Sequence, residues 1–82
     1  MNILTQILDA VENAEPVILH MRDGVPGDRS KHADVIVPNN YVTDETGGHR
    51  IPDTEVTAVS ILDRLGDWHR VEIANIAGVE CV

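Results

Sequence analysis

Cations and glycines occur together in two stretches of this chain, VPGDRSK at 25–31 and TGGHRIP at 46–52. Glycine lets backbone N–H groups approach an anion, and a neighbouring guanidinium can add two parallel hydrogen bonds. Such loops could bind a phosphate group of a nucleotide or another phosphorylated small molecule. The candidate ligand-binding residues are Arg22, Gly27, Arg29, Lys31, His32, Gly48, His49 and Arg50. Neither stretch has the spacing of a P-loop or a dinucleotide-binding motif, so solvated charged loops remain the alternative.

The first stretch also differs in charge from the rest of the chain. The formal net charge is −8, whereas residues 22–32 hold three cations and two acids, a balance of +1. The overall acidity has three explanations: a high-salt host, mimicry of nucleic-acid charge, or plain solubility. Direct binding to nucleic acid is disfavoured, because it depends on neutralising phosphates with Lys and Arg.

The remaining reactive side chains form no known catalytic or metal-binding pattern. The four histidines occur without HxxH, HExxH or paired-cysteine spacing. They are His20, His32, His49 and His69. His32 and Asp34 lie two positions apart, but two ligands do not complete a metal site. No nucleophile elbow surrounds Ser30, Ser60 or Cys81. We therefore predict no metal, no cofactor and no enzymatic activity.

Aromatic residues are scarce, since the chain has no Phe, one Tyr and one Trp. Two rings give almost no platform for stacking bases, and the core must be aliphatic. Trp68 opens a strand after a turn, where it could cover the helix or the end of a barrel. Alternatively, Trp68 could anchor a partner protein, because exposed Trp is frequent in interface hot spots. Tyr41 is the second candidate for partner binding.

An amphipathic helix over about 3–14 is the clearest element. Its apolar residues recur at helical spacing. They are Ile3, Leu4, Ile7, Leu8 and Val11. Asn2 is a plausible N-cap, and Pro16 disfavours helical geometry at the residue before it.

Strands are predicted for most of the remaining chain, because short β-branched runs alternate with turn residues. Their approximate ranges are 17–22, 33–37, 41–44, 55–63, 68–74 and 79–82. In the second strand we expect Ala33, Val35 and Val37 to share one face. Gly47-Gly48 predicts a tight reversal.

One helix followed by strands indicates a single α+β domain over residues 1–82. We expect the helix to pack on a small, strongly bent antiparallel sheet or partly open barrel of SH3/Sm-like type, with four to five strands. A chain this short gains from self-association, so a homo-oligomer is expected. No apolar run is long enough to span a bilayer and no basic signal segment opens the chain, so a cytoplasmic protein is expected.

The stretch ILDAVENAEPVILHMRDG resembles the helix, linker and first strand of the Sm-like small β-barrel family, especially its bacterial RNA-chaperone branch. RVEIANIAGVE lies where that family has its last hairpin and closing strand. The resemblance is one of architecture, since Ala77 precedes Gly78 where the family usually has a basic residue. It implies a ring-shaped homo-oligomer that binds RNA.

Three functions remain open from the sequence. The first is a small, non-enzymatic acidic binding protein, such as a mobile-element inhibitor or adaptor that occupies a basic site on a larger protein. The second is sequestration of a phosphorylated small molecule or nucleotide by the 22–32 and 47–50 loops. The third is an Sm-like RNA-binding oligomer.

Overall fold

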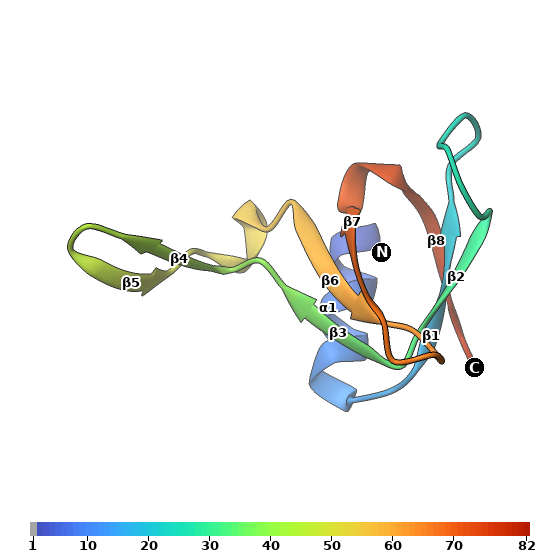
Figure 1. Ribbon diagram of the computed structural model, residues 1–82, viewed down its shortest axis with the longest axis horizontal. Helices are drawn as coiled ribbons and strands as arrows, with labels where there is room; N and C mark the ends of the chain where they lie inside the picture. The colour runs from blue at the N-terminus through green and yellow to red at the C-terminus, as the bar shows by residue number, and fades with distance from the viewer. Residues whose placement is uncertain (1) are drawn as a thin grey trace.

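A computed structural model describes residues 2–82 of the chain, except for the side chains of Tyr41–Asp44. Figure 1 shows one N-terminal helix, followed by strands and two short 3-10 turns. The elements are α1 (Ile3–Asn13), β1 (Val17–Met21), β2 (Ser30–Ala33), β3 (Val35–Pro38), β4 (Tyr41–Asp44), β5 (Gly47–Arg50), η1 (Asp53–Glu55), β6 (Ala58–Leu62), β7 (Trp68–Glu72), η2 (Ile73–Asn75) and β8 (Ile76–Cys81).

Helix α1 has defined caps at both ends. The Asn2 side chain accepts a hydrogen bond from the Thr5 backbone N–H at 2.8 Å, which confirms the predicted N-cap. Ala14 ends the helix in the left-handed conformation, with φ 52°, two residues before Pro16. The apolar stripe faces inward, and Ile7 and Ala10 are its buried residues.

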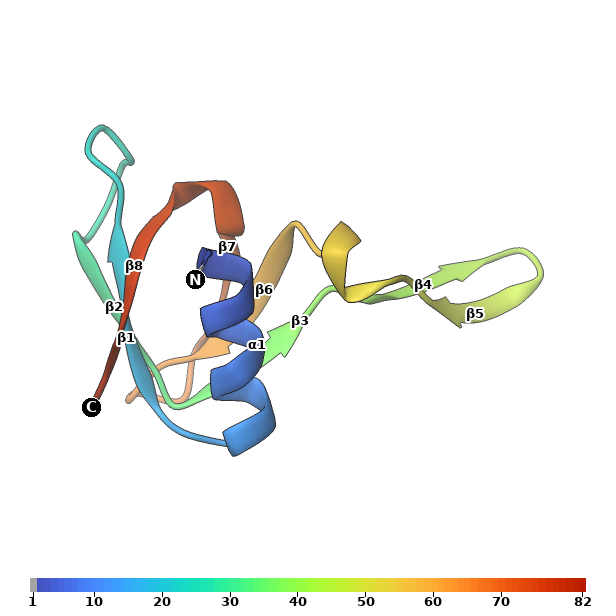
Figure 2. The ribbon, with the colours of Figure 1, turned by 180° about the vertical axis from the view of Figure 1, so that it is seen from behind.

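The strands form two antiparallel three-stranded sheets and one separate hairpin. The first sheet has the order β2-β1-β8, and the second has the order β3-β6-β7. Helix α1 packs against β3 and β8, at the side of the body seen in Figure 2. The α+β architecture with an N-terminal helix is therefore confirmed. The two sheets do not join into one closed, hydrogen-bonded barrel among the described strands.

An aliphatic core lies between the helix and the two sheets. Alternation along β1 buries Val17, Leu19 and Met21, as their spacing predicts. The largest fully buried side chains are Ile7, Leu19, Ile61, Ile76, Val17 and Val59. No polar or charged residue is buried among those whose side chains the structure describes. The fold therefore depends on aliphatic packing, with charged groups kept at the surface.

The strand is interrupted at Asp34, between β2 and β3. This interruption reverses which side chains face inward. Ala33 is fully buried, but Val35 and Val37 are 45% and 49% exposed, and Ile36 is buried instead. The expectation that Ala33, Val35 and Val37 share one face is therefore wrong. Adjacent side chains of a strand point to opposite faces, so a one-residue break exchanges the two sets.

The β4–β5 hairpin projects from one side of the body (Figures 1 and 2). Its strands pair Tyr41 with Arg50 and Asp44 with Gly47. The reversal therefore falls at residues 45–46, and Gly47 begins β5 with a φ of 117°. The tight reversal predicted at Gly47-Gly48 is wrong by two residues.

The last part of the chain forms the third strand of the first sheet. After the β6–β7 hairpin, η2 leads into β8, which pairs with β1 and places Leu19 opposite Val79. The closing strand begins at Ile76, earlier than the expected start at Val79. Strand β6 begins at Ala58, because residues 53–55 form the 3-10 turn η1 instead.

Candidate functional site

The candidate site is the face of the β3-β6-β7 sheet that points away from the core, here called the outer face. Strand register aligns its side chains in rows, because directly opposed residues share a face. The first row, called the apolar row, contains Val35, Leu62 and Trp68. The second row contains Val37, Ser60 and Arg70.

The apolar row is open to solvent over much of its area. Trp68, the only Trp in the chain, is 55% exposed, and Val35 and Val37 are each almost half exposed. When a partner covers a half-exposed β-branched or aromatic side chain, apolar area is removed from water and the free energy of the complex is lowered. Contiguous exposed apolar surface of this kind marks interaction sites in soluble proteins.

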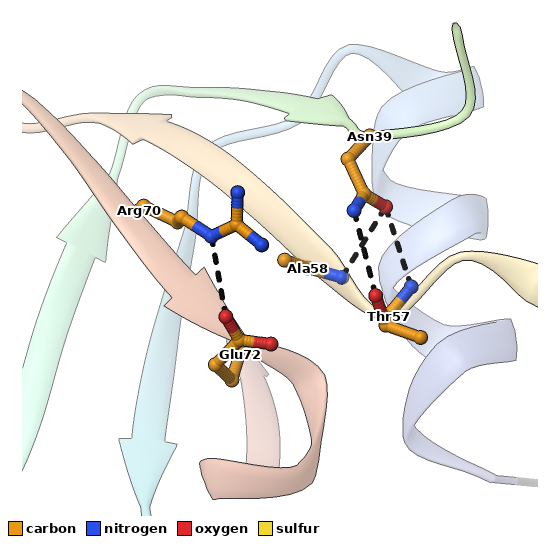
Figure 3. Close-up of polar contacts among 5 residues, drawn as sticks. All are labelled: Asn39, Thr57, Ala58, Arg70 and Glu72. Carbon is orange, nitrogen blue, oxygen red and sulfur yellow. Dashed lines mark hydrogen bonds and ion pairs between the residues drawn. The ribbon is translucent and has the colours of Figure 1, made fainter. Parts of the chain in front are cut away.

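Polar contacts border the outer face at its opposite end. Arg70 Nε donates a hydrogen bond to Glu72 Oε1 at 3.2 Å along β7 (Figure 3). Asn39 Oδ1 accepts from the backbone N–H groups of Thr57 and Ala58, both at 3.3 Å. The two Asn39 hydrogen bonds fix the start of β6 against the end of β3. The outer face therefore changes from apolar to polar along its strands.

Three carboxylates are each the sequence neighbour of one member of the apolar row, and two of them, Asp63 and Asp67, line the groove between β2 and the β6–β7 turn. This set, called the acidic end, is Asp34, Asp63 and Asp67. The Asp34 backbone N–H donates to Leu62 O at 2.8 Å, which holds this end of β3 against β6. Histidines contact two of the carboxylates, with His32 Nε2 at 2.5 Å from Asp34 Oδ1 and His69 Nε2 at 2.6 Å from Asp63 Oδ2.

Asp63 organises the turn between β6 and β7. Its Oδ1 accepts from the backbone N–H groups of Leu65 and Asp67, both at 2.9 Å. The Asp67 backbone N–H, followed by the His69 side chain, lowers the pKa of Asp63 below its ordinary value of 3.8. The carboxylate is therefore ionised at neutral pH, and its hydrogen bonds fix the residues that precede Trp68.

The two glycine-containing loops predicted to bind phosphate lie at opposite ends of the molecule (Figure 1). Residues 22–29 connect β1 and β2 on one side, and residues 47–50 belong to the projecting hairpin on the other. The long axis of the molecule measures 39 Å. One chain therefore does not bring the two loops together, and a shared site would need a second copy.

Carboxylates of the chain already engage two of the predicted phosphate ligands. The Arg29 guanidinium is paired with Asp23 of the same loop. Arg50 Nη2 lies 3.5 Å from Asp53 Oδ1. An anion would have to compete with these carboxylates for the guanidinium groups.

The other predicted site residues are distributed over one loop and four strands. Arg22 and Gly27 are exposed in the β1–β2 loop, and Lys31 and His32 are partly buried in β2. Gly48 and His49 are exposed in β5. Trp68 lies in the apolar row, and the side chain of Tyr41 lies outside the described residues.

Two further surface grooves border the helix and the β6–β7 turn. One, of about 520 Å³, lies between α1 and the base of the β4–β5 hairpin, and Leu8, Val11 and Arg50 contribute to its lining. The other, of about 320 Å³, lies between β2 and the β6–β7 turn, where His32 and His69 contribute. Within the part of the chain that the structure describes, no three or more His, Cys, Asp or Glu side chains are placed so that they could hold one metal ion.

Sequence reasoning selected Trp68 but missed Val35, Val37 and Leu62. The two valines were expected on one face with Ala33, and the structure exposes them. The one signal in the sequence is Asp34, a charged residue inside an apolar run, where the strand can break. Asp34 indicates where the strand is interrupted, but it does not indicate which face of β3 turns inward.

Comparison of the chain with family models, curated proteins and solved structures finds no match. Across residues 2–82, no helix is both long enough and apolar enough to cross a membrane.

Proposed function

We propose that this chain is a small, non-enzymatic binding protein that docks on a larger protein through its outer face. The observation that carries the proposal is the exposed Trp68, aligned with Leu62 and Val35 across three strands. Trp is the residue type most enriched in interface hot spots, and hot spots are surrounded by apolar contacts that exclude water. Val35 and Val37 would provide such contacts.

The scale of the interaction follows from the exposure of Trp68. A Trp side chain buries up to about 250 Å², so the 55% that remains exposed amounts to roughly 140 Å². At about 25 cal/mol per Å², covering this area contributes about 3 kcal/mol, which is the size of a hot spot. That contribution corresponds to roughly a hundredfold in the dissociation constant.

The acidity of the chain supports a partner with a basic site. The formal net charge is −8, and Arg29, Arg50 and Arg70 are each paired with a carboxylate of the same chain. A protein of this charge is steered toward basic surfaces and away from acidic ones. We propose that the chain acts as an inhibitor or adaptor that occupies a basic site on a larger protein.

The test compares proteins retained from an extract of the natural host by immobilised wild type and by two valine variants. Val35→Ser lies in the apolar row, and Val82→Ser removes an exposed valine at the C-terminal end. We expect the wild type and Val82→Ser to retain the same protein, and Val35→Ser to retain much less of it. Equal recovery by all three, or no specific recovery, would contradict the proposal.

The finer fold type is a separate part of the proposal. The break between β2 and β3, and the pairing of β8 with β1 after η2, support a small, partly open barrel of SH3/Sm-like type. The Sm-like homo-oligomer and its RNA binding stay predictions, and light scattering after size-exclusion chromatography would test the oligomer. Sequestration of a phosphorylated molecule also stays a prediction, testable by thermal shift with a panel of nucleotides.

A further inference from the structure

We propose that the free edge of β7 receives an extended segment of the partner protein, which adds a further strand to the β3-β6-β7 sheet. The segment would form main-chain hydrogen bonds with β7 and place one side chain beside Trp68 on the outer face. This inference rests on the proposed function, because it specifies how the partner binds at the border of the outer face.

Two backbone hydrogen bonds show the orientation of β7 against β6. The Ile73 N–H donates to Thr57 O at 2.9 Å, and the Asp63 N–H donates to Asp67 O at 3.0 Å. Both pairs of residues continue the register of the two strands, one pair at each end. Opposed residues of an antiparallel pair alternate between hydrogen-bonded and non-hydrogen-bonded pairs. The backbone groups of the odd-numbered residues of β7 therefore face β6, and those of the even-numbered residues face away.

The outward-facing backbone groups belong to Trp68, Arg70 and Glu72. Each of these residues offers one N–H and one C=O, in the alternating pattern that an extended chain matches. Strand β7 is the last strand of its sheet, and among the described strands only β6 pairs with it. Of the five residues of β7, only Val71 is buried. The edge is therefore accessible to the backbone of a partner.

The other edges of the two three-stranded sheets are obstructed. Strand β3 ends at Pro38, which has no N–H, and α1 packs on this strand. Helix α1 also packs on β8, whose pairing with β1 contains a register shift. Directly after β2, the Asp34 N–H donates to Leu62 O at 2.8 Å and holds that edge against β6. Strand β7 has no proline and no register shift, and an unobstructed edge is a template for pairing with another chain.

Charge argues against a second copy of this chain as the occupant. Full antiparallel pairing of β7 with the β7 of another copy would place Arg70 opposite Arg70, and like charges directly opposite destabilise a sheet. Each copy also carries a formal net charge of −8, which opposes association. An extended segment of a basic partner avoids both penalties and is attracted by the net charge.

Amide hydrogen exchange followed by NMR tests the free edge before any partner is added. The N–H groups of Trp68, Arg70 and Glu72 should exchange at least about tenfold faster than those of His69 and Val71, because only the second set faces β6. Equal protection of the two sets would show that the edge is already paired and would overturn the inference.

The probe for strand addition is a seven-residue peptide in which Val and Thr alternate over five positions between two terminal lysines. Its central part has the length of β7. A peptide of the same sequence with every amide N-methylated keeps the side chains but has no backbone donors. We expect the first peptide to bind saturably and to slow exchange of the three outward-facing amides by at least about threefold at saturation. The methylated peptide should bind at least about tenfold more weakly.

Two substitutions at one position separate the backbone from the side chain. Arg70→Ala and Arg70→Pro both remove the guanidinium group and its contact with Glu72 (Figure 3), but only proline removes an outward-facing N–H. Proline is tolerated at a sheet edge where the lost N–H is not part of the ladder. Arg70→Ala should stay within about threefold of the wild type, and Arg70→Pro should bind the peptide at least about tenfold more weakly. Circular dichroism confirms that each variant is folded; if Arg70→Pro is not, the two peptides on the wild type decide.

Each contrary result has a distinct meaning. Equal binding of the two peptides, equal effects of the two Arg70 substitutions, or absence of saturable binding would overturn strand addition. The proposed function is judged by recovery from the host extract. Reduced recovery with Val35→Ser, together with equal recovery by Arg70→Ala and Arg70→Pro, would keep docking on the outer face and reject strand addition. Self-association that Arg70→Pro abolishes would replace the partner segment with a second copy.

Discussion

Alanine substitutions at three consecutive positions of β3 provide a direct test of the reversed strand. The structure buries Ile36 and exposes Val35 and Val37. The sequence pattern predicts that both valines share a face with the buried Ala33. The substitutions therefore distinguish two arrangements whose outer faces differ, and only one of them places Val35 beside Trp68.

The expected magnitudes follow from burial. Buried Ile→Ala substitutions cost about 2–5 kcal/mol, and Ile36 belongs in the lower half of that range because β3 is an edge strand. Val→Ala removes two carbon atoms, worth about 0.8 kcal/mol each when fully buried. With about half of each valine exposed, we expect a loss of roughly 0.8 kcal/mol or less for Val35→Ala and Val37→Ala. An 82-residue domain has a total stability of about 4–12 kcal/mol, so the difference is large.

Urea unfolding followed by far-ultraviolet circular dichroism measures these values without relying on the exposed Trp68. With a slope of about 1 kcal/mol per molar urea, Ile36→Ala should lower the midpoint by about 2–3 M, and each valine variant by less than about 1 M. If Val35→Ala or Val37→Ala costs as much as Ile36→Ala, the reversal at Asp34 is refuted. The outer face would then lose its apolar row.

Three further substitutions test the local contacts that hold the fold. Asn39→Ala removes the acceptor for two backbone N–H groups at the start of β6, and we expect a loss of about 1–2 kcal/mol in urea unfolding, with Asn39→Asp retaining most of the stability. Asn2→Ala removes the N-cap of α1 and should cost about 1 kcal/mol with a loss of helical signal, whereas Asn2→Asp should be nearly neutral. Asp63 has a folded pKa below 3.8, so its contribution is present above that value and is lost as the pH falls through the folded pKa. Asp63→Asn should therefore be less stable than the wild type at neutral pH and show a weaker fall in urea midpoint on acidification; an unchanged pH profile would contradict this role.

The regular amphipathic elements were predictable from the sequence. The apolar residues recur at helical spacing in α1 and at every second residue in β1. Each pattern gives one apolar face, so the local sequence alone determines which face turns inward. The order of elements also determines the α+β class, because within the described residues 2–82 no second α-helix separates the strands. In these elements the hydrophobic pattern allows only one arrangement.

The β3 face was not predictable for a physical reason. Val35, Ile36 and Val37 are three consecutive β-branched aliphatic residues, so either face of the strand can be buried. The choice depends on the break at Asp34 and on the pairing of β3 with β6, which places Ile36 opposite the buried Ile61. That pairing joins residues far apart in the sequence.

The candidate phosphate site depended on a similar long-range question. The glycines and cations of each loop are evident from the local sequence. Whether the two loops come together depends on the direction in which the β4–β5 hairpin projects from the rest of the domain. The β4–β5 hairpin projects from the body on the side away from the β1–β2 loop (Figure 1). The sequence predicts Trp68 as a possible anchor because exposed Trp is frequent in interface hot spots, whereas its neighbours Leu62 and Val35 follow only from strand register.

Amide chemical-shift mapping tests the docking surface most directly. Isotope-labelled protein is titrated with a ten-residue peptide in which Leu alternates with Lys, as a basic apolar probe, and shifts of the backbone amides and of the Trp68 indole N–H are followed by NMR. We predict that the largest shifts fall on the apolar row, including the Trp68 indole. Shifts confined to the acidic residues of α1 or to the β4–β5 hairpin, with the Trp68 indole unmoved, would contradict docking on the outer face.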